Sequence, residues 1–138
     1  MEIVVERLTV PQEDIDSYDH ANCRKYLKYY QIGQEALLNR FLGVGYKGLE
    51  TGYKVRALIR HSTIEYFHEL FAGDEITINT TVGDVGNTSM TYRQSIERNS
   101  VTISEAAFTS VFTDLNRKPI SIPDEIREKL VVGNHGRA

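Results

Sequence analysis

A run of acidic side chains stands directly before the first long helix predicted in this sequence of 138 residues. Residues 13–22 read EDIDSYDHAN. Asn22 is suited to cap a helix, and the free N–H groups and dipole of a helix start can stabilise an oxyanion. A carboxylate beside that start could attack a carbonyl carbon or activate a water molecule. The same acidic residues could instead only stabilise the helix, by a few tenths of a kcal/mol each.

Other nearby groups offer different chemistry. Cys23 falls in the first helical turn and could form a nucleophile pair with His20, although no third group that would orient the histidine is evident. Glu35 lies more than three helical turns from the helix start, which makes it a minor candidate. The four histidines lack the spacing of metal ligands, so we expect no metal and no cofactor.

The spacing of apolar residues predicts the elements that position these groups. Residues 2–10 are typical of a strand. Residues 22–42 have apolar side chains at spacings of three and four over more than half of the helix circumference, which predicts a buried helix. Gly33 in the middle of this helix indicates that another backbone approaches closely.

The second half of the chain reads as strands with short connections. Glycines at 43, 45 and 48 should end the helix, and Gly86-Asn87 is typical of a hairpin. Pro123 should begin a short helix whose last turn contains Lys129. Four antiparallel strands are expected, at residues 53–71, about 76–82, about 90–96 and 101–113.

This order predicts an α+β domain in which a five-stranded antiparallel sheet wraps one long central helix. No repeat or linker divides the chain, so residues 1–138 are expected to form a single domain. An open two-layer α+β sandwich is the competing layout.

Composition excludes several classes of partner and location. Net charge is −3, with 41% hydrophobic and 25% charged residues, and no basic block could neutralise a run of phosphates, so nucleic acid is not expected as a partner. No stretch approaches 18 consecutive apolar residues, so we expect no membrane span. The first ten residues lack the apolar stretch of a signal peptide and Cys23 is the one cysteine, which together predict a cytoplasmic protein.

The acidic segment resembles the signature of the hotdog-fold thioesterases, in the 4-hydroxybenzoyl-CoA thioesterase-like group of acyl-CoA thioester hydrolases. An Asp-x-Asp stands at 14–16, a His-x-Asn at 20–22, and an aromatic–Leu pair at 26–27 of the helix. The resemblance continues through the strand region from His61 to Leu130. It implies a hotdog fold and hydrolysis of an acyl-CoA or acyl carrier protein thioester.

The resemblance also implies roles for single residues. Asp16 would be the catalytic carboxylate, as nucleophile or as general base, and the backbone N–H of His20 would be the oxyanion donor. From the residues themselves, His20 would position the substrate or hold the turn, and Asn22 would cap the helix or orient the substrate. Asp14 would orient the loop or cap a backbone N–H, and a share in the chemistry with Asp16 is the weaker alternative. Cys23 stands where some relatives have a second asparagine.

The same resemblance bears on assembly and on rival functions. Hotdog relatives build their active sites between two subunits, which implies a homodimer or homotetramer. The rival is a non-catalytic acyl-CoA-binding or scaffold protein of the same fold. A hotdog dehydratase is a weaker alternative, because its helix motif is not found in this sequence.

Overall fold

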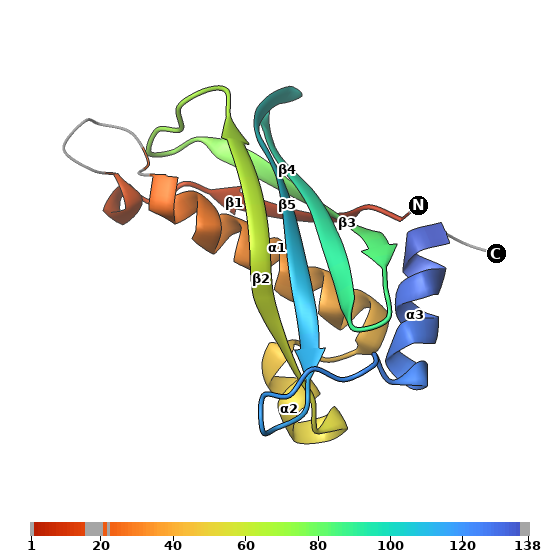
Figure 1. Ribbon diagram of the computed structural model, residues 1–138. Helices are drawn as coiled ribbons and strands as arrows, with labels where there is room; N and C mark the ends of the chain where they lie inside the picture. Colours follow the sequence, from red (N-terminus) through yellow and green to blue (C-terminus); the bar gives the residue numbers. More distant parts are fainter. Residues whose placement is uncertain (1, 16–20, 22, 136–138) are drawn as a thin grey trace.

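The computed structural model describes residues 2–15, 21 and 23–135, and one curved sheet dominates this part of the chain (Figure 1). Its five strands lie in the order β1-β3-β4-β5-β2, and each pairs with its neighbours in antiparallel orientation. The edges of the sheet are therefore β1 and β2. The strands are β1 (Val4–Thr9), β2 (Arg56–Tyr66), β3 (Glu75–Val85), β4 (Ser89–Arg98) and β5 (Val101–Thr113).

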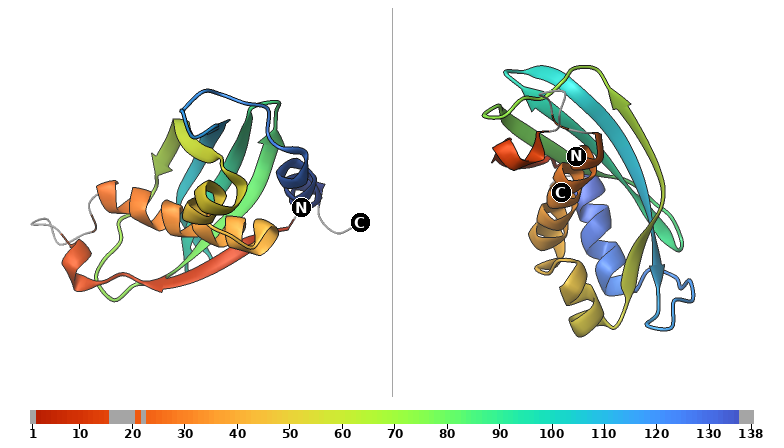
Figure 2. Two further views of the ribbon diagram at one scale, coloured as in Figure 1. Left: turned by 90° about the horizontal axis from the view of Figure 1, so that it is seen from below. Right: turned by 90° about the vertical axis from the view of Figure 1, so that its left-hand side faces the viewer.

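The long helix α1 (Cys23–Leu42) lies inside the curve of the sheet, which confirms the predicted α+β hotdog arrangement (Figure 2). A second helix packs against the sheet as well. The last helix, α3 (Asp124–His135), packs against β3 and against α1, with Ile126 and Leu130 fully buried. The core therefore combines the sheet with side chains from more than one helix, where the sequence predicted a single helix at the core.

The predicted turns between strands are found in the structure. Gly86 donates its N–H to the carbonyl of Ser89 at 2.7 Å and closes the β3–β4 hairpin. Asn99 and Ser100 have φ angles of 53° and 64°, as a tight turn between β4 and β5 requires. The hairpins fix the register that gives the sheet one apolar face.

Gly33 marks the point where α1 approaches the sheet most tightly. A Cβ at this position would lie 2.7 Å from Nε2 of Gln94 and 2.8 Å from Cγ2 of Ile78, and it would also meet Oγ1 of Thr80. The predicted close approach is therefore found, but the atoms that approach are side chains of β3 and β4 rather than another backbone.

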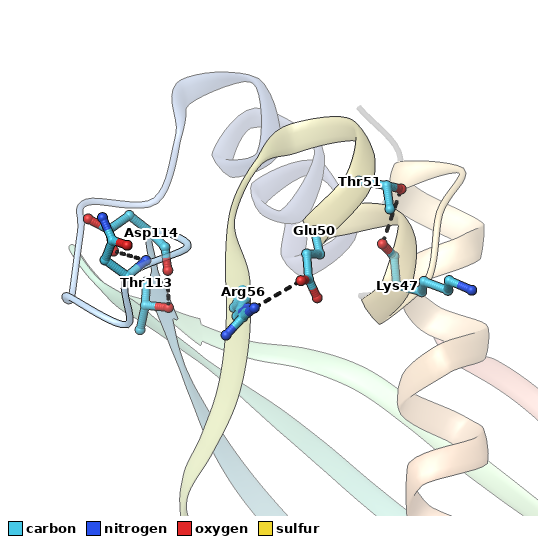
Figure 3. Close-up of polar contacts among 7 residues, drawn as sticks. Lys47, Glu50, Thr51, Arg56, Thr113 and Asp114 are labelled. Carbon is cyan, nitrogen blue, oxygen red and sulfur yellow. Dashed lines mark hydrogen bonds and ion pairs between the residues drawn. The ribbon is translucent and has the colours of Figure 1, made fainter.

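The strand predicted over residues 53–71 is found, but it is shorter: β2 covers Arg56–Tyr66. A short helix, α2 (Tyr46–Tyr53), precedes β2, and Gly48 lies inside it. Its first N–H, on Tyr46, donates to Oε1 of Glu35 at 2.9 Å, so a carboxylate on α1 caps it. Glu50 of α2 pairs with Arg56 at the start of β2 at 2.9 Å (Figure 3). Contacts with another helix stabilise α2, and the local spacing of residues does not reveal such contacts.

The end of the chain also differs from the prediction. The last helix continues to His135, so Lys129 lies in its middle and pairs with Glu125 one turn earlier, at 3.8 Å. None of the helices in the described part of the chain has the length and apolar character needed to cross a membrane.

Candidate active site

Asp14, the first acidic residue of the Asp-x-Asp motif, is a buried carboxylate fixed to α1. A 3-10 turn, Gln12–Asp14, places it beside the second turn of the helix. The hydroxyl of Tyr29 donates a hydrogen bond to Oδ2 at 2.7 Å, and Nζ of Lys28 donates to Oδ1 at 3.0 Å. Nζ of Lys25 lies 3.6 Å from Oδ1. Only 2% of Asp14 is exposed, so a substrate has no access to this carboxylate.

The surroundings of Asp14 keep it ionised. Burial alone would raise its pKa, but the hydrogen bonds from Tyr29 and Lys28 and the charges of Lys28 and Lys25 outweigh burial and lower the pKa below its usual value. The expectation that Asp14 orients the loop agrees with this geometry. Lys25 and Lys28 both pair with Asp14.

The backbone on either side of residues 16–20 is paired. Ile15 and Ala21 form an isolated antiparallel bridge. The N–H of Ala21 also donates to the carbonyl of Leu70 at 2.8 Å. The described residues on both flanks are therefore held in place: Asp14 is bonded to α1, and Ala21 is bonded to the connection between β2 and β3.

That connection, residues 67–74, is itself held by Arg98 at the end of β4. Nη1 of Arg98 donates to the carbonyl of Glu69 at 2.9 Å and to Oδ2 of Asp74 at 2.7 Å. The same Asp74 oxygen accepts the N–H of Phe71 at 2.7 Å. An ion pair at the end of a strand thus supports the loop that accepts the Ala21 hydrogen bond.

A pocket of about 240 Å³ lies between the start of α1 and this connection. Tyr26 forms one wall, and its hydroxyl donates to the carbonyl of His68 at 3.2 Å. The rings of Tyr26 and Tyr66 meet edge to face with centroids 5.0 Å apart. Burial raises the pKa of Tyr26 to about 12, so it stays a neutral donor at physiological pH. The lining residues are Ala21, Cys23, Tyr26, Tyr66, Phe67, His68 and Glu69.

The structure describes some of the residues predicted to carry the chemistry and not others. Asp16, His20 and Asn22 lie outside the described residues, so their roles stay predictions. Cys23 is exposed in the first turn of α1 and lines the pocket. Glu35 caps α2, far along α1 from the pocket, which gives it a structural role.

Sequence reasoning missed part of the pocket wall. Residues 67–69 were read as part of a long strand, which in the structure ends at Tyr66. The adjacent aromatic residues Tyr66 and Phe67 were the available signal in the sequence, and each is 47% exposed in the structure. Tyr29 and Tyr30 are fully buried in the core. Among the residues that the structure describes, no three His, Cys, Asp or Glu side chains gather as metal ligands.

A family model and several solved structures match most of this chain. A family model for the thioesterase-like superfamily matches residues 10–130, which include the acidic segment, α1, the remaining strands and the start of α3.

Solved structures of the same fold cover nearly the whole chain at low sequence identity. A predicted thioesterase from Bacillus stearothermophilus is 21% identical with a TM-score of 0.84, and the match covers 99% of each chain. A 1,4-dihydroxy-2-naphthoyl-CoA thioesterase from Synechocystis is 15% identical with a TM-score of 0.85, covering 94% of this chain and 96% of the other. A hypothetical protein from Staphylococcus aureus in complex with CoA is 14% identical with a TM-score of 0.88, covering 99% and 87%. At these identities the likeness establishes a shared fold.

Proposed function

Because this chain belongs to the thioesterase-like superfamily, we propose that it hydrolyses the thioester of an acyl-CoA or an acyl carrier protein. Hydrolysis breaks the bond between the carbonyl carbon and sulfur, and water supplies the hydroxyl of the acid and the proton of the thiol. The similar Staphylococcus aureus protein binds CoA, and the Synechocystis enzyme acts on a CoA ester. Both support CoA as the carrier of the acyl group.

In this proposal the carboxylate of Asp16 acts on the thioester carbonyl, as nucleophile or as general base. The backbone N–H of His20 stabilises the oxyanion at the start of α1, and Asn22 orients the substrate. The observation that carries the proposal is that both flanks of this segment are held: Asp14 is buried against Tyr29, and Ala21 is bonded to Leu70. Acyl transfer requires a well-positioned carboxylate and oxyanion donors, and held flanks favour such positioning.

We propose a symmetric homodimer formed through β2, with a homotetramer as the larger assembly. The edge strand β2 has β5 as its neighbour on one side, and it exposes 46% of Leu58 and 44% of Ile59. An exposed apolar edge invites pairing with a second copy. Antiparallel pairing of two β2 strands would bring the Tyr66 end of one protomer to the Arg56 end of the other. The cytoplasmic location stays a prediction.

The test is a hydrolysis screen of the purified protein over CoA esters of short, medium, long and aromatic acyl groups, with release of free thiol as the readout. The expected result is turnover of at least one ester well above the uncatalysed rate. If no ester is cleaved while the protein binds acyl-CoA in calorimetry, the thioesterase proposal is wrong and the acyl-binding alternative replaces it. The rates of hydrolysis of the preferred acyl group on CoA and on acyl carrier protein are then compared.

A further inference from the structure

The pocket at the start of α1 has walls that consist largely of aromatic rings. Tyr26, Tyr66 and Phe67 line it, and the last two side chains are half-exposed. Exposed apolar side chains that gather at one place are typical of a surface that a ligand covers. The volume of about 240 Å³ is smaller than that of pockets that enclose a whole drug-sized ligand, so it suits a compact group.

The rings of Tyr26 and Tyr66 stand almost at right angles to each other. Their planes make an angle of 76° and their centroids lie 5.0 Å apart, so the two rings form a corner. Phe67 follows Tyr66 directly in the chain and adds a third aromatic residue to the lining. Aromatic rings carry partial negative charge on their faces, and cages of such rings bind quaternary ammonium groups. The rings of this pocket therefore favour a compact cation.

A carboxylate stands beside these rings. Glu69 is the one carboxylate among the described lining residues, which include His68 but no lysine or arginine. Arg98 donates to the main-chain carbonyl of Glu69 at 2.9 Å and forms its ion pair with Asp74 at 2.7 Å. Within the described part of the chain, the Glu69 carboxylate thus keeps its charge without an ion pair. Such a carboxylate attracts a cation and repels an anion.

The charge of Glu69 acts on the same rings. Burial raises the pKa of Tyr26 to about 12, and although Arg98 opposes this change, the charges of Glu69 and Asp74 add to it. The Glu69 carboxylate is therefore close enough to influence the Tyr26 hydroxyl. Tyr26 stays protonated at physiological pH, so the negative charge of the pocket wall resides on Glu69 and not on the phenol.

The backbone behind these side chains is held in place. The N–H of Phe67 donates to the carbonyl of Ile103 at 2.8 Å. The carbonyl of His68 accepts from the hydroxyl of Tyr26 at 3.2 Å, and the carbonyl of Glu69 accepts a hydrogen bond from the end of β4. A pocket wall that is already ordered loses little conformational freedom when a ligand binds.

The proposed dimer does not neutralise this charge through Arg56. The Arg56 end of the partner strand would meet the Tyr66 end of β2. Arg56 is already paired with Glu50 of its own chain at 2.9 Å, so the pair brings no net charge to the pocket (Figure 3). A cationic ligand would therefore still find the Glu69 carboxylate unmatched by this arginine.

Resting on the proposed thioesterase function, we infer that this pocket selects acyl groups that carry a quaternary ammonium ion. The substrate class is an acyl thioester with a trimethylammonium or similarly compact cation, which lies against Tyr66 and Phe67 and pairs with Glu69. The cation takes no part in hydrolysis and serves to bind and orient the ester. A neutral group of the same shape gains only apolar contact, and Glu69 repels an anionic group.

The experiment compares CoA esters that match in shape and differ in charge. The pairs are 4-(trimethylammonio)butanoyl-CoA with 5,5-dimethylhexanoyl-CoA, and trimethylammonioacetyl-CoA with 3,3-dimethylbutanoyl-CoA. Each kcat/KM is divided by the rate of uncatalysed hydrolysis of the same ester, because a cation near the carbonyl activates the thioester by itself. The parent protein should favour the cationic member of at least one pair by about 10-fold, which equals about 1.4 kcal/mol.

Two variants with matched controls test the ring and the charge separately. Phe67→Leu removes a ring but stays apolar, and Phe71→Leu is its control, because Phe71 is 44% exposed in the same connection and is absent from the described pocket lining. Glu69→Gln removes the charge, and Glu65→Gln is its control, because Glu65 lines a different pocket. Phe67→Leu and Glu69→Gln should each reduce the ratio at least about 3-fold, and both controls should keep it.

Each outcome separates this inference from the proposed function. Turnover with equal corrected rates within each pair overturns the inference and leaves the thioesterase function standing. A preference that either Phe67→Leu or Glu69→Gln leaves unchanged also overturns it, as does an equal loss in the matched control. If no ester is cleaved, the thioesterase proposal fails, and the ratio of dissociation constants within each pair, measured by calorimetry, decides the inference. If Phe67→Leu does not fold, Glu69→Gln decides it, because the Glu69 side chain is exposed.

Discussion

The hydroxyl of Tyr29 donates a 2.7 Å hydrogen bond to the carboxylate of Asp14, which joins the acidic segment to the second turn of α1. Tyr29 is fully buried and Asp14 is 2% exposed, so this bond is shielded from water. Burial and the Asp14 charge raise the pKa of Tyr29, while the pKa of Asp14 is lowered. The pair is therefore a neutral phenol bound to an ionised carboxylate over the physiological range.

Asp14 should make stability depend on pH. Its pKa is lower in the folded chain than in the unfolded chain, so its contribution is complete above the unfolded value of about 3.9 and is lost as the pH falls through the folded value. At pH 7, Asp14→Asn should lower the free energy of unfolding by about 1–3 kcal/mol, the scale of a hydrogen bond to a charged group. Urea unfolding at fixed protein concentration measures this difference.

The difference between parent and Asp14→Asn should shrink between pH 4 and pH 2.5. A constant difference over that interval would show that the charge of Asp14 is not what stabilises the fold. Tyr29→Phe provides the control from the other side of the bond: it keeps the ring in the core and removes only the donor.

Gly33 is predicted to tolerate no large side chain. Gly33→Leu would push atoms into Thr80, Ile78 and Gln94, which is fixed by its hydrogen bonds, so the free energy of unfolding should fall by about 1–3 kcal/mol. Thermal and urea unfolding measure the change. Gly52→Leu is the matched control in α2, where an added Cβ meets nothing within 4 Å. Equal melting temperatures for parent and Gly33→Leu would contradict the close packing of α1 on the sheet.

The features that the sequence predicted well are those set by local patterns. Helix α1 and the β3–β4 hairpin follow from spacings of three and four and from Gly86-Asn87, and both are found where expected. Helix α2 was missed because its cap is Glu35, a side chain eleven residues earlier on a different helix. Contacts between side chains on different elements cannot be inferred from the local spacing of residues in the sequence.

The same reasoning applies to the candidate site. The sequence indicated an acidic segment before a helix, but not that Tyr29 would bind Asp14 or that Leu70 would bind Ala21. Tyr66 is the last residue of β2 and also lines the pocket, whereas Phe67 follows the strand. Aromatic residues are common in strands, so the sequence did not indicate where the strand ends.

The edge strand β2 should control assembly. Ile59→Asp puts a charge on an edge side chain that is 44% exposed, and it should convert the predicted dimer into a monomer without unfolding it. Light scattering at micromolar concentration gives the mass. Val132→Asp is the control, because Val132 is an equally exposed apolar residue on α3. A parent protein that is monomeric at this concentration would contradict the proposal.

Arg98 is predicted to be a positioning residue. Arg98→Ala removes the donor that holds Glu69 and Asp74, and the loop that binds Ala21 would shift. We expect kcat/KM to fall by about 10-fold or more, because small misplacements near a reacting group are costly. Arg98→Lys should restore part of it. Arg93→Ala is the control on the same strand, since its pair with Asp84 is exposed. Equal activity in parent and Arg98→Ala would rule out this role.

The last prediction concerns Asp16. Asp16→Asn keeps the shape of the side chain and most of its hydrogen bonding but removes the charge that attacks carbon or deprotonates water. With the best ester from the screen, kcat should fall by at least about 10²-fold, the usual scale for a lost general base. The melting temperature should stay close to that of the parent. Asp14→Asn should show the opposite pattern, with a clear loss of stability and a much smaller loss of kcat, because its carboxylate is buried against Tyr29.

Cys23→Ser tests the competing nucleophile in the same assay. Cys23 is exposed and lines the pocket at the start of α1, so a thiolate there could reach a bound thioester, and a serine hydroxyl could not replace it. We expect Cys23→Ser to keep nearly all activity. An inactive Cys23→Ser beside an active Asp16→Asn would assign the chemistry to the thiol. Equal activity in the parent and Asp16→Asn would by itself reject the carboxylate mechanism, whatever the serine variant does.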